Sequence, residues 1–585
     1  MIRILKYLKP YKWSVVMILV LVVIRGVLEL ALPTLMSGIL ADGLNIGSQN
    51  PIVSFDMIWY YSALMLASIV VIIIVTIVSR YFESKVSAGF SKELRKTVYE
   101  KIESFSKEEM DEFTVSSLIT RTTNDIQQLQ GYINILLGWM FLQPILAIGA
   151  IIQAVRLNLS IAFILIASLI SLVIIITVVF LIIVPQFMKM QKMVDKMNLV
   201  TRENLTGLRV VRAHNTQKYQ ELKIDEVNTD NKRLNIFVGR VNAILWPSIA
   251  LLTGLTSVGI IYFSGRGLAL DSFANYDVSK MIAMQQYSSR AIMSLMFVSM
   301  IFIMVPRARV SADRILAVLD LEPKIKESSN PVFINKEDIK GEVRFEDVSF
   351  IFTGAEQPVL SNINFTAKAG QTTAFIGSTG SGKSTLINLI PKFFVPTTGN
   401  IYIDDNDIND LSFESLYSLI GYVPQQGVLF SGTIADNIAF GKGSSLETIE
   451  ESAKIAQASN FIESFDKQYD SEIAQGGTNV SGGQRQRLSI ARAINKQPKI
   501  FIFDDSFSAL DYQTDKVLRK ALEDVSATKL IVAQRINTII NADQIIVLNN
   551  GEIVGIGTHK ELLKNSSVYQ EIAYSQLSEE ELNNE

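Results

Sequence analysis

A run of glycine, hydroxyl and lysine residues near residue 380 has the spacing of a phosphate-binding loop. It fits the pattern G-x-x-x-x-G-K-[ST] and consists of Gly377, Ser378, Thr379, Gly380, Ser381, Gly382, Lys383 and Ser384. The loop follows an apolar, strand-like stretch at 372–376 and continues through Thr385 into a helix-like stretch. In such a loop the backbone amides curl around phosphate oxygens, the lysine contacts the β- and γ-phosphates, and the last hydroxyl binds Mg²⁺. Pattern and context together predict binding of a nucleoside triphosphate with Mg²⁺, and they argue against a chance match in a glycine-rich turn.

A second chemical group is the carboxylate of Asp504, which ends an apolar, strand-like stretch at 500–503. A carboxylate in this position beside a phosphate loop typically holds Mg²⁺ through water. Buried strands often end in aspartate, so Asp504 alone is weak evidence for a Mg²⁺ site. Together with the phosphate loop it is strong evidence. We therefore expect Ser384 and Asp504 to serve the same Mg²⁺ ion.

A third group precedes a basic, helix-like stretch that begins at Arg485. Its residues are Ser481, Gly482, Gly483 and Gln484. Exposed amides at the start of a helix attract anions, whereas serine at such a position is also a common helix cap. The residue types alone favour neither interpretation.

The composition excludes several kinds of chemistry. The 585 residues include no cysteine and only two histidines, His214 and His559. Disulfides, thiolate metal sites, cysteine nucleophiles and histidine metal clusters are thereby excluded. A net charge of −3 gives no sign of nucleic-acid binding, and none is expected.

The first half of the chain contains six apolar stretches, each long enough to cross a bilayer as a helix, for which about 20 residues are needed. They lie near 13–37, 58–79, 132–155, 160–184, 242–263 and 286–306. Buried helices of a soluble core could explain one such stretch but hardly six. The N-terminal segment carries Arg3, Lys6, Lys9 and Lys12, whereas 38–57 has no lysine or arginine, so the positive-inside rule predicts cytoplasmic termini.

The pattern of apolar and polar residues changes after a polar stretch. Short apolar runs then alternate with helix-like stretches, which is typical of a layered α/β domain. We expect an all-α membrane domain of six helices at 1–320, a linker at 321–340, and a cytoplasmic α/β domain with the phosphate loop at 341–585.

The order of the motifs resembles that of ATP-binding-cassette (ABC) transporters. The resemblance covers nearly the whole chain and rests on the phosphate loop, the segment 422–425, the segment 480–484, Asp504, and the segment 508–511 that ends in Asp511. Six helices before one cassette resemble an exporter half-transporter, so the family implies ATP and Mg²⁺ as cofactors and a dimer with two ATP molecules sandwiched between cassettes. Each ATP would touch the phosphate loop of one cassette and the serine-glycine motif, here 481–484, of the other.

The resemblance also assigns roles to individual residues. Gln425 would sense the γ-phosphate and Mg²⁺, and Phe352 would stack on adenine, where most relatives have tyrosine. The stretches 117–126 and 203–215 resemble the inner-loop segments that dock onto nucleotide domains.

Two positions of the catalytic constellation depart from the family pattern. Asp505 stands where an active cassette has the glutamate that polarises the attacking water, and Gln534 stands where the family has its switch histidine. A third departure is Gln475, where many relatives have glutamate. Two changes in one constellation, with the binding residues retained, resemble the degenerate-site subunit of a heterodimeric exporter, whose partner supplies the glutamate and the histidine.

The sequence thus predicts an ATPase-coupled exporter of amphipathic small molecules, of the multidrug type, in a bacterial plasma membrane. It would act as one half of a heterodimer whose own ATP site hydrolyses slowly. The alternatives are a homodimeric exporter of lipid or peptide with slow ATPase activity, and a nucleotide-gated channel or regulator.

The membrane stretches also contain ionisable residues. Arg25 and Glu29 lie one helical turn apart in the first stretch, and the polar run 285–290 ends in Arg290. Arg25 and Glu29 could pair with each other, brace neighbouring helices or contact substrate. The run 285–290 is a candidate wall of a polar cavity.

Overall fold

The structure is a computed structural model that describes residues 2–45, 53–269, 277–441 and 443–577. It divides into two compact units, which are described separately below. The first comprises Met1–Glu103 and Val115–Leu321, and the second comprises Ser104–Thr114 and Glu322–Glu585.

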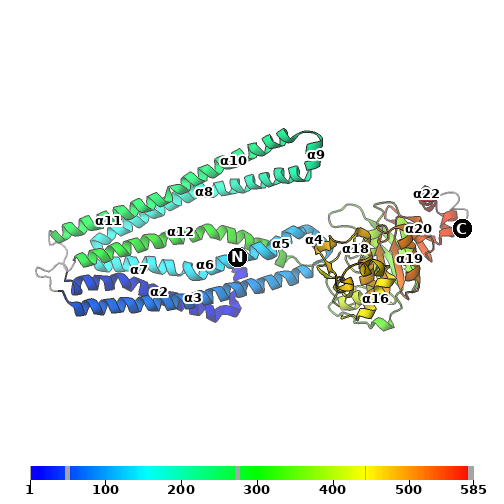
Figure 1. Cartoon of the computed structure of the whole chain (residues 1–585), viewed down its shortest axis with the longest axis horizontal. Helices are drawn as coiled ribbons and strands as arrows, with labels where there is room; N and C mark the ends of the chain where they lie inside the picture. The colour runs from blue at the N-terminus through cyan, green and yellow to red at the C-terminus, as the bar shows by residue number, and fades with distance from the viewer. Residues whose placement is uncertain (1, 46–52, 270–276, 442, 578–585) are drawn as a thin grey trace. The chain divides into compact units, whose positions relative to one another are not determined.

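Six long helical segments form the first unit (Figure 1). Each is long and apolar enough to cross a membrane, and they span Arg3–Gly43, Phe55–Glu103, Val115–Leu157, Leu159–Thr206, Gln217–Gly267 and Val278–Asp320. The predicted six-helix class is therefore confirmed. The helices are much longer than the apolar stretches, because the polar, largely glycine- and proline-free sequence on their inner side continues the helical pattern.

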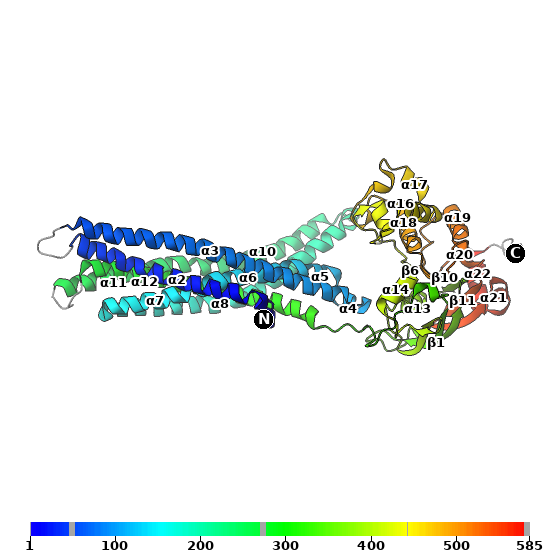
Figure 2. The ribbon, with the colours of Figure 1, turned by 90° about the horizontal axis from the view of Figure 1, so that it is seen from below.

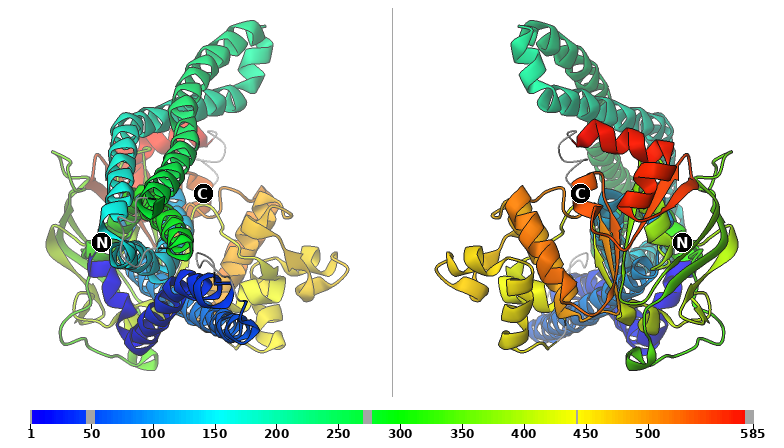
Figure 3. Two further views of the ribbon diagram at one scale, coloured as in Figure 1. Left: turned by 90° about the vertical axis from the view of Figure 1, so that its left-hand side faces the viewer. Right: turned by 90° about the vertical axis from the view of Figure 1, so that its right-hand side faces the viewer.

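The individual helices of this unit are mostly continuous. They are α1 (Ile2–Leu5), α2 (Lys12–Gly38), α3 (Phe55–Glu103), α5 (Val115–Thr120), α6 (Ile126–Ile135), α7 (Leu142–Leu157), α8 (Leu159–Thr206), α9 (Leu208–Ala213), α10 (Gln217–Ala243), α11 (Leu245–Ala269) and α12 (Val278–Asp320). The shorter η1 (Lys6–Tyr11), η2 (Ile39–Gly43), η3 (Arg121–Asp125) and η4 (Leu136–Met140) link or extend them. Helices α8 and α10 run side by side and are joined at one end by α9 (Figure 3).

Helices α2 and α12 are joined by a series of polar contacts. Ser37 Oγ donates to Ser279 Oγ at 3.1 Å. The Tyr287 hydroxyl lies 2.7 Å from Thr34 Oγ1 and donates to the Leu30 carbonyl at 2.7 Å. Because Tyr287 is 1% exposed, its hydroxyl needs these partners. These bonds fix the register of the two helices.

The second unit is built on a six-stranded sheet with the order β12-β11-β3-β10-β9-β6. The five strands from β11 to β6 are parallel, and β12 is an antiparallel edge strand. A four-stranded antiparallel sheet, β2-β1-β4-β5, and the small pair β7-β8 complete the strands. In chain order the strands are β1 (Val343–Phe350), β2 (Leu360–Ala367), β3 (Thr372–Gly377), β4 (Thr398–Ile403), β5 (Asn406–Asp407), β6 (Ile420–Val423), β7 (Gly432–Thr433), β8 (Glu472–Ile473), β9 (Ile500–Asp504), β10 (Thr528–Val532), β11 (Gln544–Asn549) and β12 (Glu552–Gly557).

Both faces of the parallel sheet are covered, which explains why its strands read as continuous apolar runs. One face packs with α13 and the antiparallel sheet, and the other packs with α15, α16, α18, α19 and α22. The antiparallel sheet (green) and the helical part (yellow to orange) lie on opposite sides of the unit in Figures 2 and 3. The helices are α13 (Lys383–Leu389), α14 (Phe413–Leu419), α15 (Ile434–Ala439), α16 (Leu446–Ile455), α17 (Ser459–Glu463), α18 (Gly482–Asn495), α19 (Tyr512–Glu523), α20 (Ile536–Ile539), α21 (His559–Asn565) and α22 (Ser567–Gln576).

A short helix from the first half of the chain belongs to the second unit. It is α4 (Lys107–Phe113), which begins with a capping box between Ser106 and Glu109. Lys324 donates its backbone N–H to Glu109 Oε1 at 3.1 Å and its Nζ to Glu108 Oε2 at 2.5 Å. The stretches 117–126 and 203–215, which we expect to dock onto nucleotide domains, both lie in the first unit, and their docking stays a prediction.

Candidate nucleotide site

The phosphate loop connects β3 to α13, as its sequence context predicts. Gly380 and Gly382 have φ values of 85° and 95°, in the left-handed region that favours glycine. A Cβ on Gly377 would lie 2.1 Å from the Leu548 carbonyl oxygen, so only glycine fits where the loop leaves the sheet. Ser378, Thr379, Gly380 and Ser384 are exposed, whereas Ser381 and Gly382 are buried and Thr385 is half-buried. The outer part of the loop is thus open to a ligand.

Lys383 is held at the centre of the loop. Its Nζ donates to the carbonyls of Gly377 at 2.9 Å and Ser378 at 2.7 Å, and the residue is only 8% exposed. Burial lowers the pKa of this ammonium, while the nearby carboxylates of Asp505 and Asp504 act in the opposite direction. The two carbonyls hold the Lys383 ammonium in the loop, and a compact cation in this place is suited to binding phosphate oxygens.

Ser384 and Asp504 come together from α13 and β9. Ser384 Oγ donates to Asp504 Oδ1 at 2.7 Å, and Asp504 is 7% exposed. Burial raises the pKa of the Asp504 carboxyl, although the Ser384 hydrogen bond and the charges of Lys107 and Lys383 oppose this rise. A hydroxyl next to a carboxylate is an all-oxygen donor set that suits Mg²⁺. These residues therefore fit the predicted Mg²⁺ and, when bound, the ion would neutralise phosphate charge beside them.

The three predicted catalytic residues meet at one carboxylate oxygen. Asp505 Oδ2 accepts a hydrogen bond from Gln534 Nε2 at 2.9 Å and one from Gln425 Nε2 at 3.3 Å. Burial raises the pKa of the Asp505 carboxyl, and the hydrogen bond from Gln425 opposes this rise. Asp505 has a φ of 47°, which aspartate tolerates better than most residues. Asp505 therefore holds the side chains of Gln425 and Gln534 at a single point of the site.

Phe352 lies two residues after the end of β1, in an aromatic cluster. Its ring packs edge-on against Phe350, with 4.8 Å between centroids, and against Phe394, at 5.4 Å. The half-buried ring has a fixed orientation, which suits a stacking surface for a base.

The residues 481–484 lie in the helical part and not beside the phosphate loop. Ser481 Oγ accepts a hydrogen bond from the Gln484 backbone N–H at 3.2 Å, and Gln484 Oε1 accepts one from the Ser481 N–H at 2.9 Å. The helix cap is therefore formed, yet the hydroxyl proton of exposed Ser481 stays available for an anion. Asp511 likewise caps α19 by accepting from the Thr514 N–H at 3.0 Å.

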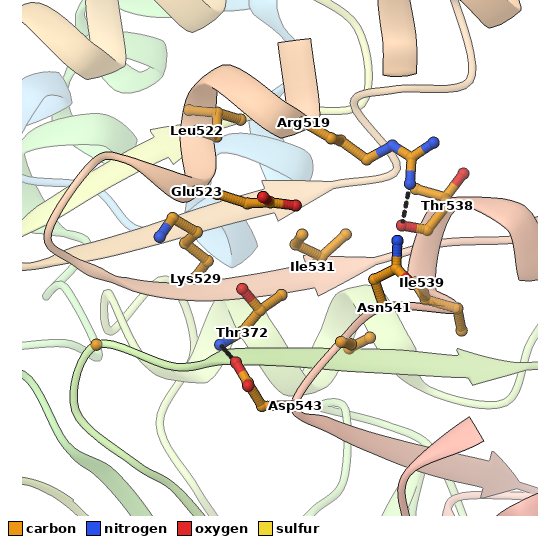
Figure 4. A pocket seen from close by; sticks show the side chains of 13 residues that line it. Thr372, Arg519, Leu522, Glu523, Lys529, Ile531, Thr538, Ile539, Asn541 and Asp543 are labelled. Carbon is orange, nitrogen blue, oxygen red and sulfur yellow. Dashed lines mark hydrogen bonds between the residues drawn. The ribbon is translucent and has the colours of Figure 1, made fainter. Parts of the chain in front are cut away.

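A separate cavity of about 310 Å³ lies at the opposite end of the parallel strands (Figure 4). Thr372 and Lys529, at or near the start of β3 and β10, line it. Three of its charged groups have partners. Asp543 Oδ2 accepts from the Thr372 N–H at 2.8 Å, Lys529 Nζ donates to the Val525 carbonyl at 2.9 Å, and Arg519 pairs with Asp515 at 3.0 Å. This cavity is not part of the nucleotide site.

Sequence reasoning missed the contribution of α4 to this unit. Lys107 Nζ lies 5.7 Å from the ring centroid of Phe394, beside Phe352. The Glu108 carboxylate accepts from Thr353 Oγ1 at 3.0 Å. The spacing of Ser106 and Glu109, a capping-box pattern, is the signal that could have marked a separate short helix here.

Comparisons with known proteins agree with this architecture. The family described as "ABC transporter" matches residues 360–508, and "ABC transporter transmembrane region" matches residues 15–296. An uncharacterized ABC transporter ATP-binding protein of Mycobacterium tuberculosis is 37% identical over 98% of this chain and 97% of its own length. An ATP-dependent lipid A-core flippase of Chromohalobacter salexigens is 29% identical over 99% of this chain and 98% of its own. A solved bacterial Atm1-family ABC exporter with ATP bound superimposes with a TM-score of 0.79, at 23% identity, over 97% of this chain and 99% of the solved chain.

The chain belongs to the ABC transporter family. It has the ABC exporter fold, with six membrane helices and a cytoplasmic nucleotide-binding domain, and the family implies the use of ATP.

Proposed function

We propose that this chain is one half of a heterodimeric ABC exporter of amphipathic small molecules in a bacterial plasma membrane, with both termini cytoplasmic. Its own site would hold ATP and Mg²⁺ and hydrolyse ATP slowly. The observation that carries this proposal is the constellation of Asp505, Gln425 and Gln534, in which two uncharged amides bind one short carboxylate.

This constellation suits nucleotide binding better than rapid hydrolysis. Aspartate is one methylene shorter than glutamate, which withdraws the carboxylate by roughly 1 Å, and a misplacement of that size can cost about 100-fold in rate. The oxygen that would polarise water also accepts two hydrogen bonds already. Gln534 can donate a hydrogen bond but cannot carry a proton as a histidine does.

The residues that would serve a partner's site are intact. Ser481 and Gly482 are exposed at the start of α18, and Gly483 is half-buried there. With the hydroxyl proton of Ser481 available, this end of α18 can complete a site on another chain. We infer that the partner is a second half-transporter that carries the catalytic glutamate and the switch histidine.

A second candidate is a homodimeric lipid exporter, whose two identical sites would hydrolyse ATP without a second kind of chain. It is favoured by the full-length similarity to the lipid A-core flippase. The two candidates differ in the ATPase activity expected of the chain alone.

The test is ATP turnover by the purified chain, compared with the double variant Asp505→Glu, Gln534→His. ATP binding is measured in both, and Lys383→Ala in the double variant reports contaminating ATPase. Our proposal predicts that the native chain binds ATP with little turnover, and that the double variant gains activity that Lys383→Ala abolishes. Brisk turnover by the native chain alone would refute the degenerate site and favour the homodimer.

A further inference from the structure

The six predicted membrane stretches contain few charged side chains. Only Arg25, Glu29 and Arg290 carry a formal charge there. Their charges sum to +1. Since an ionised side chain within a bilayer is costly and usually marks a functional site, this surplus positive charge needs an explanation.

The structure brings all three residues together, although Glu29 and Arg290 are 261 positions apart in the chain. Arg25 Nε donates to Glu29 Oε1 at 2.7 Å, and Arg290 Nη1 donates to Glu29 Oε2 at 2.6 Å. Glu29 lies 14 residues before Gly43 and Arg290 lies 12 residues after Val278, so each is roughly 20 Å from the nearer end of its helical segment at 1.5 Å per residue. The cluster thus lies well inside the span.

One arginine is sufficient to neutralise Glu29, and the second is left without a counter-charge. The Glu29 side chain is 10% exposed, whereas those of Arg25 and Arg290 are 24% and 37% exposed. Among the described residues, neither arginine has a hydrogen-bond acceptor other than Glu29. The carboxylate is therefore enclosed, and N–H groups of both guanidinium ions remain available on the accessible side.

A purely structural role explains only part of this arrangement. The pair Glu29–Arg290 joins α2 to α12, but neutral hydrogen bonds of Tyr287 and Ser279 already join these helices. Arg25 lies on the same helix as Glu29 and adds nothing to the link between helices. Its charge raises the electrostatic cost unless an anion binds.

We propose that Arg25 and Arg290 bind the anionic headgroup of the transported amphiphile: a carboxylate, sulfate or phosphate. Guanidinium groups present planar pairs of donors that match such groups. Gln286 and Met293 lie one helical turn on either side of Arg290, and Met293 is 43% exposed, so an adaptable apolar side chain adjoins the charge. The inference rests on the proposed function only in assuming that the chain handles amphiphiles.

The test measures binding and needs neither ATP nor a partner. The full chain in phosphatidylcholine nanodiscs is titrated with a fluorescent 12-carbon carboxylate and with the same fluorophore and chain ending in trimethylammonium. The carboxylate is expected to bind at least about tenfold more tightly, since hydrogen bonds to charged groups are the strong ones. Competition by short-chain phosphatidic acid then distinguishes a lipid headgroup from a free acidic amphiphile, and either result supports the anion site.

Four variants decide whether the cluster is responsible. Arg25→Gln and Arg290→Gln each leave one neutral pair and should abolish the preference for the carboxylate, whereas Arg25→Lys should retain most of it. Arg266→Gln, an exposed arginine at the far end of α11, is the control and should leave the preference unchanged. Retained ATP binding and an unchanged thermal transition exclude misfolding. A native chain without the preference, or a preference that survives both glutamine substitutions, would overturn the proposal whatever the ATPase result.

Discussion

Arg492 of α18 fixes the segment that follows Gln425. Its Nε and Nη2 donate to the backbone and side-chain oxygens of Asn437, and its Nη1 donates to the Val428 carbonyl, all at 2.8 Å. The guanidinium also lies 5.4 Å from the Phe430 ring and 4.7 Å from the Phe440 ring. Burial lowers the pKa of Arg492 to about 10, so the side chain stays charged at neutral pH.

The substitution Arg492→Lys keeps the charge but removes the planar fork. A single ammonium, which ends one atom short of the terminal guanidinium nitrogens, can reach about one of the three acceptors, so two hydrogen bonds from a charged donor are lost. At about 1.5–3 kcal/mol each, less what water recovers, the expected cost is about 3 kcal/mol. Such a cost corresponds to about 100-fold in the equilibrium for local opening, at about 1.4 kcal/mol for each tenfold change.

The assay is amide hydrogen exchange of the full chain, read at α15, which contains Asn437. We expect protection there to fall by about 100-fold in Arg492→Lys while protection of β3 is unchanged. Arg487→Lys, on the same helix, is the control and should have a smaller effect. Arg487 makes only one short hydrogen bond, at 2.7 Å, and one long one, at 3.4 Å, so lysine loses less there. Unchanged protection of α15, or an equal loss in the control, would refute the reasoning.

Three further results are expected. Burial raises the pKa of the Asp505 carboxyl, so this group's contribution to stability is lost as the pH rises from the ordinary aspartate value through the raised one. Asp505→Asn should remove this dependence and raise the melting temperature more at pH 7 than at about pH 4, the ordinary pKa of aspartate, and equal gains at the two pH values would contradict it. Gly551→Ala and Gly354→Ala both place alanine at a left-handed φ, which costs about 1–2 kcal/mol of stability in each variant. Only at Gly551 would the new Cβ also lie 2.4 Å from a backbone oxygen, so the melting temperature of Gly551→Ala should fall further than that of Gly354→Ala. Tyr287→Phe should cost about 0.5–1.5 kcal/mol in thermal unfolding, because the hydrogen bond from the buried hydroxyl to the Leu30 carbonyl is lost, and a neutral substitution would count against that bond.

The sequence predicted those features that depend on local pattern. The strand at 372–376, the phosphate loop and the strand ending at Asp504 all lie where apolar runs and glycine spacing indicate, because a parallel sheet covered on both faces requires such runs. The contact of Gln534 with Asp505 was available only through family resemblance, since no local pattern connects residues 29 positions apart.

Features that depend on distant partners could not be predicted. The helical period of α2 places Arg25 and Glu29 on one face of that helix. It does not reveal that Arg290, on α12, pairs with Glu29. The separate position of α4 depends on Lys324, more than 200 residues later in the chain. In both cases a buried carboxylate is paired with a residue from a distant part of the chain. The sequence pattern of one segment carries no information about such a distant partner.

The contacts between α2 and α12 also have a mechanical meaning. From Glu29 to Ser37 they extend over eight residues, about 12 Å of helix at 1.5 Å per residue. Sliding one helix past the other by a turn, about 5.4 Å, would break every one of these bonds at once. The two helices should therefore move as a single rod. Large rearrangements of the membrane domain are then left to bending or to hinges elsewhere, and the spacing of Arg25 and Arg290 is preserved throughout them.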